Sequence, residues 1–135
     1  MLQVMKINIY PIKSARRAEV KEASFDRLGL ENDRRWAVVD LSLKAKAIRT
    51  QRNEGFEKLA LITPSVTQDH LTLNAPGMPE LTIPKNTNID EAFKVKLFSQ
   101  KPLVVDQGKE AREWLSDFFG SEVQLVYQPP ELKGT

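Results

Sequence analysis

Short segments of alternating hydrophobic and polar residues make up most of the chain, and this period-two pattern predicts β-strands. The clearest segment is residues 36–40, where Trp36 opens an apolar run that ends in Asp40. Turn signals separate the segments, and Ala75-Pro76-Gly77 is the strongest of them. We expect strands at residues 4–9, 18–25, 36–40, 48–50, 59–62, 70–74, 81–83, 93–98, 103–106 and 123–127.

One segment near the C-terminus follows a helical period instead. Its apolar residues recur at i, i+3, i+4 and i+7, which is one face of a helix. Gly120 follows where the helix would stop, because glycine readily adopts the left-handed conformation of a helix C-cap. The pattern predicts one α-helix at about residues 109–119, followed by a final strand. The residues on its apolar face are Ala111, Trp114, Leu115 and Phe118.

Together these elements predict a mainly β fold: a closed or nearly closed, mostly antiparallel β-barrel with one C-terminal α-helix and a final strand. A β-sandwich is the alternative, but closure is favoured because it removes exposed strand edges. The length of 135 residues fits one domain. We expect the barrel domain to span residues 1–128, with residues 129–135 as a linker or frayed tail.

The residue types that are missing exclude several classes of site. The chain has no cysteine, which excludes disulfides, thiolate nucleophiles and cysteine-based metal sites, and its single histidine cannot build a histidine-rich site. We therefore predict no metal site and no catalytic residues in this chain. The sequence contains no run of about 18 apolar residues and no evident signal peptide. By elimination, we expect a cytoplasmic protein that has no membrane partner.

Positive charge is concentrated in the first part of the chain. Up to Arg52 there are 12 Lys and Arg against 6 Asp and Glu, whereas from Asn53 onward there are 8 against 12. Within the first part, basic residues gather in three turns that adjoin predicted strands, at residues 10–14, 29–36 and 49–52. Positive charge gathered at strand ends favours the binding of an anion.

Lys13 and Ser14 are the first candidate anion ligands. They follow Pro11, which fixes φ and ends the strand. Lys13 supplies a positive charge, and Ser14 supplies a hydroxyl and a backbone N–H in a turn, a combination that suits a phosphate oxygen. A solvated turn without function is the alternative, and the dipeptide taken alone favours it.

The second candidate is the segment Asp33-Arg34-Arg35-Trp36. If the strand has already begun, Arg34 and Arg35 point to opposite faces, so that one lies at the barrel end and the other in solvent. Asp33 could orient one guanidinium through a bidentate pair and leave its other donors for a ligand. A structural Asp–Arg pair, with Trp36 in the core, is an equally good interpretation.

Arg49 and Arg52 form the third candidate, on the return strand of the Trp36 hairpin. Hairpin pairing would bring one of them near Arg34 and Arg35. Such a cluster of like charges would need acids or a bound anion to compensate it. A charged, solvent-facing edge that resists aggregation is the slightly favoured alternative.

These turns, taken in order with the later strands, resemble the MOSC N-terminal β-barrel domain. In that family the barrel precedes the catalytic MOSC domain of bacterial molybdenum enzymes, amidoxime-reducing components and molybdenum cofactor sulfurases. The resemblance runs from about residue 3 to residue 128. The matching segments are Tyr10-Pro11-Ile12-Lys13-Ser14, Gly29-Leu30, Asp33-Arg34-Arg35-Trp36, Val39-Asp40, Thr50-Gln51-Arg52, Leu59 to Pro64, Leu71-Thr72-Leu73, Ala75-Pro76-Gly77 and Trp114 to Gly120.

The resemblance implies a partial site for the molybdenum cofactor (molybdopterin), because the family's barrel helps to bind its phosphate and pterin. The matching positions are Lys13, Ser14 and Arg34, and Arg52 matches the basic position of the Thr-x-Arg segment. The family's metal-binding cysteine lies in the catalytic domain, which would begin where this sequence ends. Residues 15–17, Ala-Arg-Arg, stand where the family usually has Cys or Met, then Arg and Gly.

The resemblance therefore implies the N-terminal barrel of a molybdenum-cofactor oxidoreductase that is not catalytic as an isolated chain. Its implied partners are a catalytic MOSC domain, in cis or in trans, and an electron-transfer domain. The alternative is a small barrel that binds single-stranded nucleic acid or another anionic partner through the same arginines. Such sites need exposed stacking aromatics, and the first 52 residues supply few of them, so nucleic acid is the weaker hypothesis. Those aromatics are Tyr10, Phe25 and Trp36.

Overall fold

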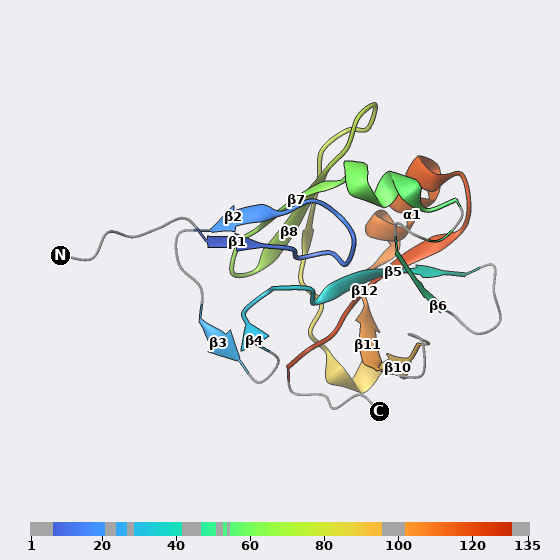
Figure 1. The fold of residues 1–135 in the computed structure, drawn as a ribbon. Coiled ribbons are helices and arrows are strands. Elements are labelled where there is room, and N and C mark those ends of the chain that lie inside the picture. The colour runs from blue at the N-terminus through green and yellow to red at the C-terminus, as the bar shows by residue number, and fades with distance from the viewer. Residues whose placement is uncertain are drawn as a thin grey trace.

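A nearly closed β-barrel forms the body of the protein (Figure 1). The computed structural model describes residues 7–20, 24–26, 29–41, 47–50, 53, 55–95 and 102–130. The largest sheet has the order β10-β11-β12-β5-β6, and all its neighbouring strands are antiparallel. Its strands are β5 (Trp36–Asp40), β6 (Ala47–Arg49), β10 (Phe93–Lys94), β11 (Leu103–Asp106) and β12 (Val123–Tyr127).

In the described ranges, three smaller antiparallel units complete the β-structure. In Figure 1 the β1–β2 hairpin lies with β7 and β8 at the left, whereas β5, β12 and α1 lie toward the right. The hairpin consists of β1 (Ile7–Ile9) and β2 (Ala18–Val20), the meander of β7 (Thr63–Val66), β8 (His70–Asn74) and β9 (Leu81–Pro84), and the third unit of β3 (Phe25–Asp26) and β4 (Gly29–Leu30).

The sheets join into a barrel at places where no regular ladder connects them. A parallel bridge between Ile12 and Trp36 ties the segment after β1 to the start of β5, and β2 lies beside β7. Between the end of β9 and the end of β11, side-chain hydrogen bonds take the place of a strand ladder. The Gln107 side-chain amide donates to the Asn86 carbonyl at 2.9 Å, and the Asn86 amide donates to the Asp106 carbonyl at 2.9 Å. The predicted nearly closed antiparallel barrel is confirmed.

Strands β5 and β12 are buried on both faces. Their alternate residues pack into two separate hydrophobic clusters, one on each face of the sheet. Trp36 and Tyr127, whose ring centroids are 4.8 Å apart, belong to the main core together with residues of α1 and of β8. Val39 and Val126 point to the other face and join a smaller cluster. Trp36 therefore lies in the core, as one interpretation of its segment required.

Helix α1 (Lys109–Phe119) confirms the predicted helix and its buried face. Gly120 has φ +71°, and its N–H donates to the Ser116 carbonyl at 2.9 Å, which ends the helix as a left-handed C-cap. Trp114 is 7% exposed, and its indole N–H donates to the Pro79 carbonyl at 2.6 Å. This bond satisfies the polar edge of a side chain whose remaining surface packs in the core.

The strand predicted at residues 59–62 is wrong. Residues Glu57–Leu61 form a 3-10 helix (η1), and β7 begins only after it, at Thr63. Leu59 and Ile62 are both fully buried, whereas Leu61 between them is 39% exposed. That i, i+3 spacing is one turn of a 3-10 helix, and a short apolar run does not distinguish it from a strand.

Other expected strands differ in extent. The single strand expected at residues 18–25 is two strands, β2 and β3, which pair with different partners. Strand β10 covers only Phe93–Lys94 of the expected 93–98 segment, and residues 96–98 lie outside the described ranges, as do residues 4–6 of the first expected strand. A second 3-10 helix, η2 (Ile89–Glu91), precedes β10. In the part of the chain that the structure describes, no helix is long and apolar enough to cross a membrane.

Candidate functional site

Two turns that are distant in sequence lie side by side, and we call residues 10–15 and 31–36 the paired turns. Three backbone hydrogen bonds join them: Arg34 N–H to the Tyr10 carbonyl at 2.6 Å, Trp36 N–H to the Pro11 carbonyl at 2.9 Å, and Lys13 N–H to the Trp36 carbonyl at 2.8 Å. The structure thus places Lys13 and Ser14 in the turn that is bonded to the turn of Arg34.

Asp33 connects the two turns through its carboxylate. Its Oδ1 accepts a hydrogen bond from the Tyr10 backbone N–H at 2.9 Å, and its Oδ2 accepts one from Arg34 Nη1 at 2.8 Å. Each oxygen therefore serves a different partner, in place of the bidentate pair that the sequence suggested. The Arg34 guanidinium also lies over the Tyr10 ring, with Cζ 5.3 Å from the centroid. These contacts hold the Arg34 side chain in place.

Arg34 and Arg35 have different roles. The Arg35 residue is 6% exposed, and its guanidinium donates to the backbone carbonyls of Asp33 (2.5 Å) and Leu30 (2.9 Å). It therefore fixes the turn from inside. The Arg34 side chain is 58% exposed, and Asp33 occupies only one of its nitrogens among the described residues. Arg34 is therefore the arginine that remains available to a ligand.

The backbone of the paired turns is strained. In the described ranges, the non-glycine residues with positive φ are Ser14 (+71°), Asn32 (+65°) and Arg34 (+54°), and all three lie in the paired turns. Asparagine tolerates this conformation, but serine and arginine adopt it at a cost of about 1–2 kcal/mol each. Strained residues of this kind often cluster at ligand sites, where the surrounding structure enforces a required geometry.

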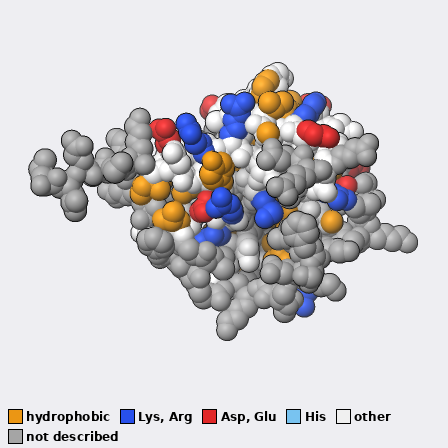
Figure 2. Space-filling view, in the orientation of Figure 1, with side chains coloured by type: hydrophobic (Ala, Val, Ile, Leu, Met, Phe, Trp, Pro, Cys, Tyr) orange, Lys and Arg blue, Asp and Glu red, His pale blue; other side chains and the backbone are white. Residues whose placement is uncertain are grey.

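The paired turns keep several donors free. Among the described residues, the Lys13 ammonium group, the Ser14 hydroxyl and the Ser14 backbone N–H have no hydrogen-bond partner. Arg34 adds its remaining guanidinium nitrogens. In Figure 2 a few Lys and Arg side chains lie near the middle of the face in view, and others are spread toward its edges. Positive charge with a hydroxyl and a backbone N–H is a donor set that suits a phosphate group.

Lys85, which the sequence did not single out as a site residue, contacts the turn at residues 31–36. Its Nζ donates to Asn32 Oδ1 at 2.8 Å and lies 5.6 Å from the centroid of the Trp36 ring. Burial lowers the pKa of Lys85 below its ordinary value of 10.5, although the nearby Glu31 and Asp69 carboxylates oppose that shift. Lys85 follows Pro84 at a strand end with no motif around it, so only the structure reveals this contact.

The third candidate turn does not join this cluster in the described residues. Arg49 pairs in register with Val38, and its Nε lies 3.4 Å from Asp40 Oδ2, at the end of β5 away from Arg34. Arg52 lies outside the described residues. Arg49 therefore stabilises its own hairpin. Of the two arginines of which one was expected to lie near Arg34, only Arg49 is described, and it lies away from Arg34.

The structure gives little support for a nucleic-acid surface at these turns. Trp36 is completely buried, so it cannot stack on a base, whereas Tyr10 is 40% exposed with Arg34 over its ring. The side chain of Phe25 lies outside the described part of the chain. One exposed aromatic residue is a small stacking platform by the standard of single-strand binders.

Known proteins are similar to this chain in sequence and in fold. The family model of the MOSC N-terminal beta barrel domain matches residues 1–122. Mitochondrial amidoxime-reducing component 1 of Danio rerio is 31% identical over 136 residues, 96% of this chain and 40% of that protein. Molybdenum cofactor sulfurase of Danio rerio is 32% identical over 129 residues, 91% of this chain and 15% of that protein. The chain thus spans less than half the length of these relatives.

A solved structure agrees with the barrel. The solution structure of a Bordetella bronchiseptica protein aligns with a TM-score of 0.58 and 23% identity, covering 80% of this chain and 87% of that one. At this identity the likeness concerns the fold alone. The family match is independent of it and covers most of the chain. The chain therefore belongs to the MOSC N-terminal beta barrel domain family.

Proposed function

We propose that this chain is the N-terminal barrel of a molybdenum-cofactor-dependent oxidoreductase and that the paired turns bind the phosphate end of the cofactor. The proposal rests on one observation: backbone strain and hydrogen-bond donors without a partner in the described residues occur at the same residues. Ser14 and Arg34 both have positive φ, and both carry donors that have no partner among the described residues. The residues present therefore fit a phosphate group.

Each residue has a distinct part in the proposed site. Lys13 contributes a positive charge, and Ser14 contributes its hydroxyl and its backbone N–H. Arg34 contributes guanidinium donors that Asp33 and Tyr10 have already oriented, so little side-chain entropy is lost on binding. Arg52 is a further proposed ligand on the strength of its position in the family motif.

The cofactor would supply the redox chemistry at its metal when bound. This chain contains no cysteine, so a thiolate ligand for the metal would come from a catalytic MOSC domain, in cis or in trans. We infer that the chain alone is not catalytic and that residues 1–128 form the barrel domain. A cytoplasmic location and an electron-transfer partner belong to the same proposal, as does reduction of N-hydroxylated compounds, which the amidoxime-reducing relatives' names suggest.

A fluorescence titration with a phosphorylated pterin tests this assignment. The wild-type chain should quench the pterin saturably with weak affinity, because it offers the phosphate contacts without the rest of the cofactor site. The same pterin without its phosphate should bind at least about tenfold more weakly, since the charge-assisted bonds are lost. The double variant Lys13→Ala/Arg34→Ala should bind both pterins equally poorly.

The matched control removes the same charge elsewhere. Lys94 and Lys109 are exposed, and Lys94→Ala/Lys109→Ala should leave the affinity for the phosphorylated pterin unchanged at constant ionic strength. Equal losses in both double variants would show that net charge alone attracts the ligand. Equal affinity for the two pterins in the wild-type chain would contradict a phosphate site.

A further inference from the structure

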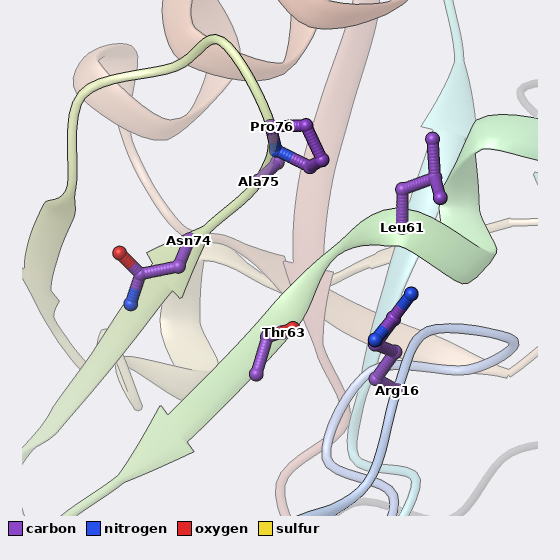
Figure 3. Close-up of a pocket in the computed structure, with 6 residues that line it drawn as sticks. All are labelled: Arg16, Leu61, Thr63, Asn74, Ala75 and Pro76. Atoms are coloured by element: carbon purple, nitrogen blue, oxygen red, sulfur yellow. The ribbon is translucent and has the colours of Figure 1, made fainter.

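A separate hollow of about 230 Å³ lies between the segment after β1 and the strands β7 and β8 (Figure 3). Its volume is below the roughly 300–1,000 Å³ of sites for drug-sized ligands, so it fits a small molecule or the end of a larger one. None of Lys13, Ser14 and Arg34 lines it. The lining residues are Arg16, Leu61, Thr63, Asn74, Ala75 and Pro76.

Arg16 is fixed at the edge of this hollow before any ligand arrives. Its backbone N–H donates to the Ile62 carbonyl at 2.9 Å, and its side-chain Nε donates to the Ala60 carbonyl at 2.9 Å. These two bonds orient the guanidinium while leaving both Nη atoms without a hydrogen-bond or ion-pair partner among the described residues. In Figure 3 the guanidinium extends toward the segment of Leu61, and Thr63 lies to its left.

The other lining residues divide into polar and apolar groups. Thr63 and Asn74 are cross-strand partners of β7 and β8, and neither side chain has a hydrogen-bond partner in the described ranges. Leu61, Ala75 and Pro76 supply the apolar part of the lining, and Leu61 is 39% exposed despite its size. The hollow thus combines one oriented arginine, two polar side chains and an apolar surface.

We propose that this hollow binds a small carboxylate that carries a short apolar body. A carboxylate matches the planar fork of the two free Nη groups and balances a single positive charge. The apolar body would cover Leu61 and Pro76, and the Thr63 hydroxyl adds a further donor. The paired turns differ, because they offer Lys13 and Arg34 together and so favour a phosphate with two negative charges.

An NMR titration with butyrate, using its neutral analogue butyramide as the comparison ligand, tests the proposal. Butyrate should give saturable shifts of the Arg16 Nε–H signal and of the amides of Leu61, Thr63, Asn74 and Ala75. Butyramide should give none at the same concentrations. Arg16→Gln should weaken butyrate binding at least about tenfold, because it removes the charge and the fork.

The neighbouring residue provides a matched control. Arg17 is exposed and lies outside the hollow, so Arg17→Gln should keep the butyrate affinity. Arg16→Lys keeps the charge but loses the planar fork, so it should retain only part of the wild-type butyrate affinity. Equal loss in Arg16→Gln and Arg17→Gln, shifts with butyramide, or butyrate shifts confined to residues 13–14 and 33–34 would overturn the proposal. Inorganic phosphate should shift the paired turns instead, so this inference and the proposed function can fail separately.

Discussion

Replacing Ser14 by glycine should stabilise the protein and weaken anion binding at the same time. Ser14 has φ +71° within the tight turn that the Ala15 N–H closes onto the Ile12 carbonyl at 3.0 Å. An L-residue adopts this left-handed conformation at a cost of about 1–2 kcal/mol, which glycine avoids. Glycine loses more backbone entropy on folding, about 0.5–1 kcal/mol. The net expected gain is about 0.5–1 kcal/mol in the free energy of unfolding.

Thermal unfolding followed by circular dichroism measures this gain, which corresponds to a rise of about 2–4 °C in the midpoint for a domain of this size. Ser65→Gly is the matched control, since Ser65 is an exposed residue of β7, where glycine should destabilise the protein by about 0.5–1 kcal/mol. A midpoint for Ser14→Gly that falls as far as that of Ser65→Gly would refute the strain argument. In phosphate titrations, both Ser14→Gly and Ser14→Ala should bind more weakly than wild type.

Three further predictions follow from buried side chains. Trp114→Ala should lower the free energy of unfolding by about 3–5 kcal/mol in urea titrations, since the indole is buried and bonded to the Pro79 carbonyl; a loss under about 1 kcal/mol would contradict this packing. Arg35→Ala should cost about 2–4 kcal/mol by the same measurement, and Arg34→Ala at most about 0.5 kcal/mol, because only Arg35 is buried on carbonyls. Because burial lowers the pKa of folded Lys85 below its unfolded value of 10.5, the penalty for charging Lys85 is complete below the folded pKa and disappears as pH approaches 10.5. Stability should therefore rise between the lowered pKa of folded Lys85 and 10.5, and Lys85→Met should lack this part of the rise in urea titrations carried out up to that pH.

The sequence predicts an element correctly where its local pattern fits only one type of secondary structure. The apolar residues of α1 recur at helical spacing, and the helix ends at a glycine C-cap. Both signals depend only on residues that are close together in the sequence. The segment at residues 59–62 has no such uniqueness, since four apolar residues in a row fit a strand or one turn of a 3-10 helix equally well. Burial of Leu59 and Ile62, which depends on tertiary packing, decides between them.

The sequence proposes Lys13, Ser14, Arg34 and Arg52 as ligands, but it does not predict the geometry of the turns that hold the first three. Arg34 and Arg35 would alternate between two faces only within a strand, whereas β5 begins at Trp36 and Arg34 has a positive φ. The split between an exposed and a buried arginine therefore results from a turn conformation that residue types alone do not reveal. Barrel closure through Asn86 and Gln107, and the contact of Lys85 with Asn32, likewise depend on side chains that meet only after folding.

The most direct test of the central claim is to titrate inorganic phosphate into the protein and follow its backbone amides by NMR. We expect saturable shifts, at millimolar phosphate, that cluster on residues 13–15 and 33–35, with the Ser14 amide among the largest because its N–H has no other partner among the described residues. Lys13→Ala/Arg34→Ala should abolish them, and Lys94→Ala/Lys109→Ala should not. The absence of shifts at the paired turns, or shifts that persist unchanged in Lys13→Ala/Arg34→Ala, would contradict an anion site there.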